Sequence, residues 1–334
     1  MTVARSRLSV IGALVGAVIT LLAPGVAHAD AAGPTDYRTV IETIEPAVDG
    51  LDVTIEGGDA FMRLTAPVGS EVIVFGYVGE PYLRFSPDGT VAQNLRSAAT
   101  YENEERYGGV ELPGIVEPAA EPEWETVATG GVWAWHDHRS HWMGDRPPIG
   151  LEPGDTLPTQ IVPISVDGTP VEIVVSTTLV ESPSWFAPAV GALIGLQLAL
   201  LGLWLGLAVS TLVTSLLAGA ALVVGAAQFR SLPAETGPLT TWWLLPALAL
   251  ACGLATIALY GRSRIVEIGL LMVAAVQLGI WALLRRSGLT AAVLPTDLAF
   301  WFDRAVTAAV LLAAPVLLIG AIRSLLNLAS RPAT

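Results

Sequence analysis

The hydrophobic residues of this chain are concentrated in its second half. Residues 186–326 are almost free of charge apart from short breaks, whereas residues 30–185 have the composition of a water-soluble domain. Across all 334 residues, 53% are hydrophobic, which is high for an ordinary soluble protein of this size. The chain is therefore expected to have a water-exposed half and a membrane half.

Five membrane-spanning helices are predicted in the second half. Residues 187–229 carry no charge, and as one helix at about 1.5 Å per residue they would measure about 65 Å, roughly twice the hydrocarbon thickness. We therefore predict two spans joined by a turn near Val209; the alternative, one long helix and four spans in all, reverses the orientation of the later spans. The predicted spans are residues 187–208, 210–229, 239–260, 265–284 and 305–322, followed by a cytoplasmic tail at 327–334.

Residues 1–29 have the pattern of a secretory signal peptide. Two arginines precede an apolar run over residues 8–22, and Ala27-His28-Ala29 offers small residues for cleavage. Export would place residues 30–185 outside the plasma membrane, and five spans would leave the C-terminus in the cytoplasm. Because the only cysteine, Cys252, lies in a hydrophobic run of the membrane half, the exported domain is expected to fold without disulfides.

The exported half is strongly acidic. Residues 30–185 contain 26 acidic residues and 7 arginines, a net charge of −19. Such a domain repels nucleic acid and anionic lipid, so neither is expected as a partner, and a protein of the cell envelope is the partner class that remains. The charged run at 101–106 is interpreted as a solvated face.

Short strands separated by turns account for most of residues 30–185. Residues 51–55 and 61–65 alternate between apolar and polar side chains, and 71–77 and 171–179 are rich in β-branched residues. Glycine-containing turns separate these segments at short spacing. This pattern predicts an antiparallel β-sandwich of the immunoglobulin or cupredoxin type, which together with the membrane helices gives a mixed fold.

Three histidines fall within six residues, in the segment Trp133-Ala-Trp-His-Asp-His-Arg-Ser-His-Trp-Met143. If residues 133–139 form a strand, His136 and His138 share one face, and a bend after residue 139 would bring His141 to them. Neutral imidazoles suit Cu(II) or Zn(II), and a methionine adds affinity for Cu(I). The segment therefore predicts a metal site, with copper favoured over zinc. The predicted ligands are His136, His138, His141 and Met143.

The other residues of this segment allow two interpretations. In a metal site, Asp137 would orient a ligand ring, and the tryptophans would restrict solvent. In a structural motif, the tryptophans belong to the core, Asp137 pairs with Arg139, and each histidine bonds to a backbone carbonyl. Rings that converge on one point favour metal, whereas divergent rings favour the structural interpretation. The supporting residues in question are Trp133, Trp135, Asp137, Arg139 and Trp142.

A second motif, Gly76-Tyr-Val-Gly-Glu-Pro-Tyr-Leu-Arg84, mixes aromatic and charged residues. It predicts a strand–turn–strand unit, with the alternative that its side chains line a site shared with the histidines. No nucleophile elbow, HExxH or P-loop motif occurs, so no catalytic residue is predicted.

The combination of these features resembles a known family. A signal peptide, a β-rich domain with the motifs GYxGEPYLRF and WxWHDHRxHWM, and C-terminal spans resemble a family of uncharacterised membrane proteins from high-GC Gram-positive bacteria. The resemblance covers nearly the whole chain and implies this architecture, but no catalytic residues. The size and strand content of the exported domain also resemble those of exported copper-handling β-sandwiches, at the level of fold alone.

Two functions are compatible with the sequence. The first is a membrane-anchored protein that binds or handles a metal outside the cytoplasm, with copper favoured. The second is a non-enzymatic cell-envelope scaffold or interaction module, in which the histidine and tryptophan motif is structural.

Overall fold

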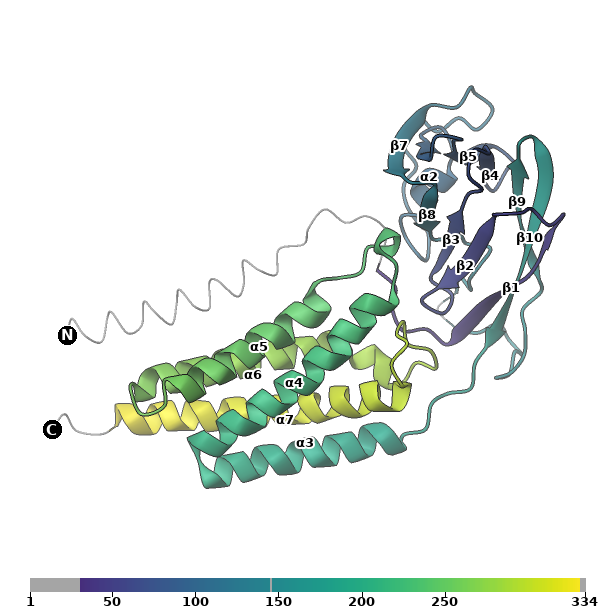
Figure 1. The fold of residues 1–334 in the computed structure, drawn as a ribbon. Helices are drawn as coiled ribbons and strands as arrows, with labels where there is room; N and C mark the ends of the chain where they lie inside the picture. Colours follow the sequence, from purple (N-terminus) through teal and green to yellow (C-terminus); the bar gives the residue numbers. More distant parts are fainter. Residues whose placement is uncertain (1–30, 145, 331–334) are drawn as a thin grey trace.

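The computed structural model describes residues 31–144 and 146–330 of the chain. A β-rich domain is followed by a bundle of five long helices (Figure 1), which confirms the predicted mixed fold. The predicted signal peptide lies outside the described residues, as does the second half of the predicted cytoplasmic tail, residues 331–334.

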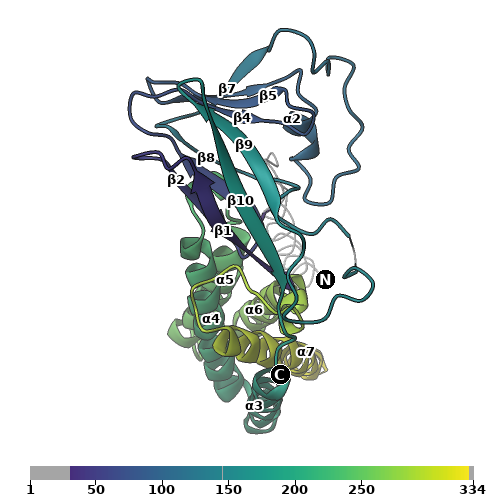
Figure 2. The same cartoon turned by 90° about the vertical axis from the view of Figure 1, so that its right-hand side faces the viewer.

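The β domain consists of two antiparallel sheets (Figure 2). The larger sheet has the strand order β1-β10-β9-β4-β5-β6-β7, and the smaller sheet has the order β2-β3-β8. Every pairing between neighbouring strands is antiparallel. The strands are β1 (Tyr37–Glu45), β2 (Asp52–Glu56), β3 (Phe61–Thr65), β4 (Val72–Phe75), β5 (Pro81–Phe85), β6 (Thr90–Asn94), β7 (Trp124–Thr129), β8 (Val132–Trp135), β9 (Gln160–Val166) and β10 (Thr169–Leu179).

The core of this domain lies between the two sheets. Met62 and Leu64 of the smaller sheet pack in one cluster with Val74, Leu83 and Phe85 of the larger sheet, and all five side chains are fully buried. Burial of a side chain of this size contributes roughly 1.5–3 kcal/mol. In strands such as β4 and β9, buried residues alternate with more exposed ones, so every second side chain points into this core.

The five helices are long and apolar enough to cross a membrane, which makes the chain a multi-pass membrane protein. The predicted turn near Val209 lies instead at Gly206, whose φ of 97° is readily adopted by glycine. The last helix is longer than the predicted span and contains the start of the predicted tail. The helices are α3 (Phe186–Leu205), α4 (Leu207–Ser231), α5 (Thr241–Ala258), α6 (Arg264–Leu284) and α7 (Phe300–Ala329).

Small residues allow the helices to approach closely. A Cβ atom at Gly191 would lie 2.0 Å from the carbonyl oxygen of Ala305, and one at Gly195 would lie 2.2 Å from that of Ala309. Glycine at these two positions therefore lets α3 pack with its backbone against α7. Close backbone packing of this kind is typical of helices in lipid.

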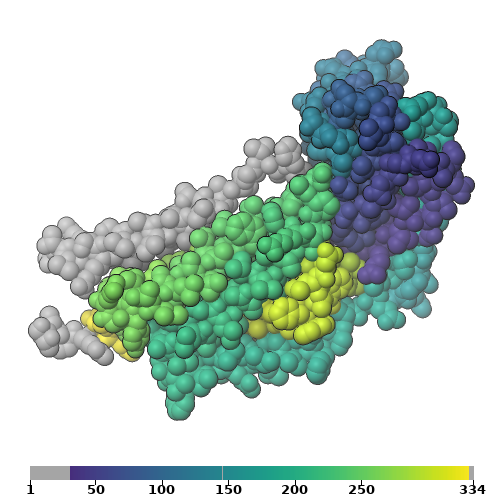
Figure 3. All heavy atoms as spheres, viewed as in Figure 1, coloured from purple at the N-terminus to yellow at the C-terminus, as the bar shows by residue number. Residues whose placement is uncertain are grey.

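The β domain is docked on one end of the bundle (Figures 1 and 3). Thr35 forms a two-bond antiparallel bridge with Val293 in the loop between α6 and α7, with N···O distances of 3.0 and 2.8 Å. Phe61 of β3 belongs to a buried cluster with Leu232 and Trp242 of the membrane half. Hydrogen bonds and apolar packing thus join the two halves into one unit.

Arg304 of α7 holds the loop that makes this junction. Its guanidinium donates hydrogen bonds to the carbonyl oxygens of Gly288, Ala291 and Ala292, at 3.1, 2.6 and 3.0 Å. The α6–α7 loop is therefore fixed to the bundle on one side and to the β domain on the other.

Candidate functional site

The histidine segment begins where strand β8 ends, at Trp135. The condition of a strand over residues 133–139 is therefore not met beyond Trp135, and the argument from alternation does not apply to His136 and His138. A turn follows the strand at Asp137, whose side chain accepts a hydrogen bond from the backbone of Arg139 at 3.0 Å and whose carbonyl accepts one from Ser140 at 2.7 Å. Aspartate commonly forms such turns.

His136 is buried beneath the turn between β2 and β3. Its Nδ1–H group donates to the carbonyl oxygen of Ala60 at 2.5 Å. Its ring stacks on Phe61, with centroids 4.1 Å apart and an interplanar angle of 21°. His136 therefore fastens the histidine segment to the turn that contacts the membrane half.

His138 is partly exposed and contacts two other loops. Its Nε2–H group donates to the carbonyl oxygen of Glu105 at 3.1 Å. Its backbone N–H donates to the hydroxyl of Tyr77 at 3.0 Å, and the two rings stack with centroids 5.6 Å apart. Of the second motif, Tyr77 does share a site with the histidines, whereas Arg84 lies over the ring of Trp124.

His141 is buried and uncharged. Burial, together with the nearby charge of Arg106, lowers the pKa of His141 to about 3. Its Nδ1–H group donates to the carbonyl oxygen of Trp142 at 3.3 Å, and no hydrogen-bond partner of Nε2 occurs among the described residues. The ring lies edge-on to those of His136 and His138, with centroids 6.5 and 5.5 Å away.

Asp137 and Arg139 form the ion pair of the structural interpretation. Two guanidinium nitrogens lie 2.8 Å from the two carboxylate oxygens, and the indole of Trp135 donates to the same carboxylate at 3.0 Å. Burial alone would raise the pKa of Asp137, but Arg139 and these hydrogen bonds lower it below its usual value. The carboxylate is thus used by Arg139 and Trp135 rather than by a ligand ring.

The tryptophans and Met143 have separate environments. Trp135 is buried in the sandwich core, and Trp133 packs against the same core. Trp142 is half-buried and donates to the carbonyl oxygen of Arg146 at 2.7 Å. Met143 lies at the edge of a pocket. Within the described part of the chain, no three His, Cys, Asp or Glu side chains are arranged to hold a metal.

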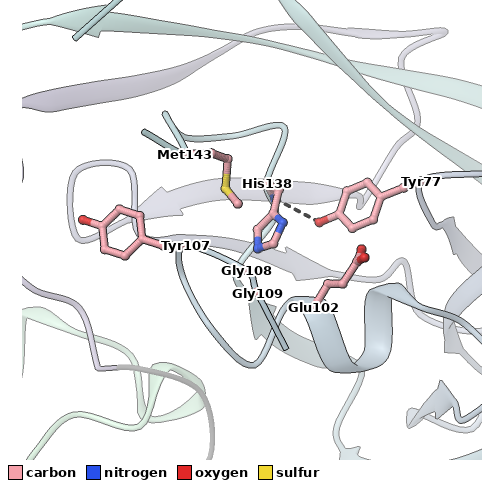
Figure 4. Close-up of a pocket in the computed structure, with 7 residues that line it drawn as sticks. All are labelled: Tyr77, Glu102, Tyr107, Gly108, Gly109, His138 and Met143. Atoms are coloured by element: carbon pink, nitrogen blue, oxygen red, sulfur yellow. Dashed lines mark hydrogen bonds between the residues drawn. The ribbon is translucent and has the colours of Figure 1, made fainter. Parts of the chain in front are cut away.

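The pocket beside Met143 has a volume of about 300 Å³ (Figure 4). His138 is the one predicted histidine that lines it, and Glu102, from the short helix α2 (Ala99–Glu102), and Tyr107 contribute further side chains. The sequence did not reveal these two residues, because they belong to the segment interpreted as a solvated charge run and its flank. The lining residues are Tyr77, Glu102, Tyr107, Gly108, Gly109, His138 and Met143.

The same charge run supplies a buried ion pair that the sequence did not predict. Arg106 lies 2.6 Å from Asp59, whose carboxylate also accepts a hydrogen bond from Thr35 at 3.2 Å. Burial raises the pKa of Asp59, although Arg106 opposes the shift. Because Thr35 forms the bridge to Val293, this pair connects the surroundings of the histidines to the junction.

These features define a class of molecule: a multi-pass membrane protein whose two-sheet β domain is docked on one end of its helices. Compared with protein-family models, curated proteins and solved structures, the chain shows no significant match.

Proposed function

We propose that this protein is a non-enzymatic scaffold or interaction module of the cell envelope. The observation that carries the proposal is that each of the three imidazoles donates a hydrogen bond to a backbone carbonyl. The acceptors are the carbonyl oxygens of Ala60, Glu105 and Trp142. The histidine segment in this proposal is a structural fastener that holds surface loops in place for a partner.

The second observation that supports this proposal is the attachment of the β domain to the helical bundle. The bridge between Thr35 and Val293 and the cluster around Phe61 and Trp242 fix the domain to the bundle. A domain held in this way presents one surface in a constant orientation to the membrane. Its net charge of −19 suits a protein partner with a basic surface.

The proposed location is the plasma membrane, with the β domain outside and the C-terminus in the cytoplasm. This orientation rests on the predicted signal peptide and on the odd number of helices. The arginines agree with it, because two of those beside the β domain are used internally: Arg285 pairs with Asp303 at 2.6 Å, and Arg304 binds carbonyls. Uncompensated positive charge normally favours the cytoplasmic side.

Substitution of His136 tests the structural role. In purified full-length protein freed of metal with a chelator, His136→Ala is expected to lower the unfolding free energy by about 1–3 kcal/mol, because the carbonyl of Ala60 loses its partner and Phe61 loses packing. Thermal unfolding followed by tryptophan fluorescence would measure this. Chelator alone is expected to leave the protein folded. Unfolding by chelator, or an unchanged melting temperature of the variant, would refute the proposal.

A further inference from the structure

We propose that two copies of this chain form a dimer through helix α3, in which the side-chain amide of Gln197 hydrogen-bonds to the same amide of the second copy. The contact surface is the face of α3 that is turned away from the other helices. Such a dimer does not depend on which side of the membrane the β domain occupies, because both copies insert in the same orientation.

Helix α3 lies at the edge of the bundle, on the side away from the β domain (Figure 2). It is the least buried of the five long helices and packs mainly against α7 and α4. Small residues make this contact, and they recur every three or four positions along one face. These residues are Gly191, Gly195, Ala199 and Gly202. The opposite face of α3 is therefore left open to a partner within the bilayer.

Gln197 lies on this open face, where its side chain is exposed. Its amide makes no hydrogen bond with the described residues. At about 1.5 Å per residue, Gln197 is about 12 Å from the nearer end of α3, which places it in the middle of the hydrocarbon layer. A glutamine side chain is too short to reach the headgroups from there. Because an unpaired polar group is costly in lipid, the amide needs a partner inside the membrane.

Gln197 differs in this respect from the other polar residues of the bundle. No other serine, threonine or glutamine within the five long helices, all of which the structure describes, is exposed. The hydroxyls bond to carbonyl oxygens of their own helix, as when Thr214 donates to Ser210 at 2.8 Å. Gln228 is buried and accepts a hydrogen bond from Arg285. Gln197 is therefore the polar side chain that the single copy leaves unsatisfied in lipid.

Exposed apolar residues continue the face on both sides of Gln197. Together with Gln197 they follow one another in alternating steps of four and three residues, which is the spacing of the a and d positions in a coiled coil. Helices in membranes commonly cross with the same left-handed geometry. A single polar residue within such a row fixes the register and the number of helices. The apolar residues of the row are Phe186, Val190, Leu193, Leu200 and Trp204.

A second copy of the chain fits this face because its own row matches the first in depth and in chemistry. Both copies insert in the same orientation, so a two-fold axis along the membrane normal brings identical residues together at the same level. A primary amide has two N–H donors and an oxygen acceptor. Two Gln197 side chains on such an axis therefore satisfy each other, while the apolar residues above and below them pack in pairs.

Association of the full-length protein in liposomes tests this dimer. Ser287→Cys in a Cys252→Ala background provides one labelling site per chain. Energy transfer between donor-labelled and acceptor-labelled copies is measured as the ratio of lipid to protein is raised, and a reversible dimer is expected. Gln197→Leu is expected to lower the association constant by about 5–30-fold, the contribution of a hydrogen bond between membrane helices. Gln197→Asn keeps an amide and is expected to lower it less.

Cross-linking in native membranes locates the contact. In the Cys252→Ala background, Leu193→Cys, on the row, is expected to form a disulfide between two copies on oxidation. Leu254→Cys, which replaces an exposed leucine of α5, is the matched control and is expected to stay monomeric. The melting temperature of Gln197→Leu is expected to equal that of the wild type, because the Gln197 amide has no hydrogen-bond partner in a single copy.

Four results would overturn the assignment. They are a wild type that stays monomeric at every ratio of lipid to protein, association of Gln197→Leu as strong as that of the wild type, oligomers larger than dimers, and cross-linking of Leu254→Cys as efficient as that of Leu193→Cys.

Discussion

The β domain and the helical bundle bury their residues in opposite ways. The core of the β domain is built from large side chains such as Leu83 and Phe85, which two sheets enclose. The bundle places small residues such as Gly195 and Ala309 at its contacts and turns large ones such as Leu193 and Trp204 outward. In water, removal of apolar surface drives packing, whereas lipid provides no such force and close backbone contact replaces it.

The buried polar groups show a second difference. In the β domain, Asp137 and Arg139 fasten the histidine segment to the larger sheet, and a second buried group includes the hydrogen bond from Ser97 to Glu80. In the bundle, Arg285 pairs with Asp303 and hydrogen-bonds to Gln228 at the end next to the β domain, whereas buried Glu267 pairs with Arg264 at the opposite end. The buried polar groups of the β domain thus hold loops in place, whereas those of the bundle include ion pairs at both ends.

The largest effect is expected at the contact between α3 and α7. Gly195→Leu would drive a side chain into the backbone of Ala309, where even a Cβ atom would lie 2.2 Å from the carbonyl oxygen. The free energy of unfolding is expected to fall by more than about 3 kcal/mol, which is at the upper end of the losses caused by overpacking an interior. Unfolding in SDS followed by circular dichroism would measure it.

Gly219 in α4 provides the matched control, because a Cβ atom there would meet nothing within 4 Å. Gly219→Ala is expected to be neutral or to stabilise the helix by up to about 1 kcal/mol. If Gly195→Leu were as stable as Gly219→Ala, close backbone packing would not be what holds the bundle together.

A somewhat smaller loss of stability is expected when the ion pair between Asp137 and Arg139 of the β domain is broken. Asp137→Asn leaves the largely buried guanidinium of Arg139 without its counter-charge and is expected to lower the free energy of unfolding by about 3 kcal/mol. Replacing both residues, by Asn and Met, is expected to restore part of the loss, since no charge is then left unpaired. Chemical denaturation monitored by tryptophan fluorescence provides the measurement.

Exposed Glu172 on β10 is the control for the loss of one carboxylate. Glu172→Gln is expected to change stability by less than about 0.5 kcal/mol. A similarly small change in Asp137→Asn would show that the β domain, like the bundle, depends on packing rather than on its polar network.

The sequence predicts helices and strands well where a whole segment, or one face of it, has a uniform environment such as lipid or the protein core. Charge-free stretches revealed the helices, and alternation revealed strands such as β2 and β3. The break at Gly206 was misplaced by three residues, because any residue of an apolar run can end a span and only the backbone angle of this glycine distinguishes it.

The site was less predictable, because its contacts join distant segments. Arg106 pairs with Asp59 across 47 positions of sequence, and nothing near either residue indicates the other. The residues of the predicted metal site were identified as a segment, yet the structure sends His136, His138 and Asp137 to different partners. Tertiary contacts, which spacing along the chain does not report, decide where these loop side chains point.

The smallest effect on stability is expected from Ser287→Cys. This variant is also the most direct test of which side of the membrane the β domain lies on. Ser287 is exposed in the loop beside the β domain, so its substitution should leave the fold unchanged. A membrane-impermeant maleimide is expected to label this cysteine in intact cells, because the proposed orientation places the junction outside. The native Cys252 lies within helix α5, so the wild-type chain supplies the background signal.

Arg262→Cys, at the opposite end of the bundle between α5 and α6, is the matched control and should be labelled only after lysis. The reverse pattern would place the β domain in the cytoplasm and refute the proposed location. It would leave the comparison of cores intact, since water bathes the β domain on either side.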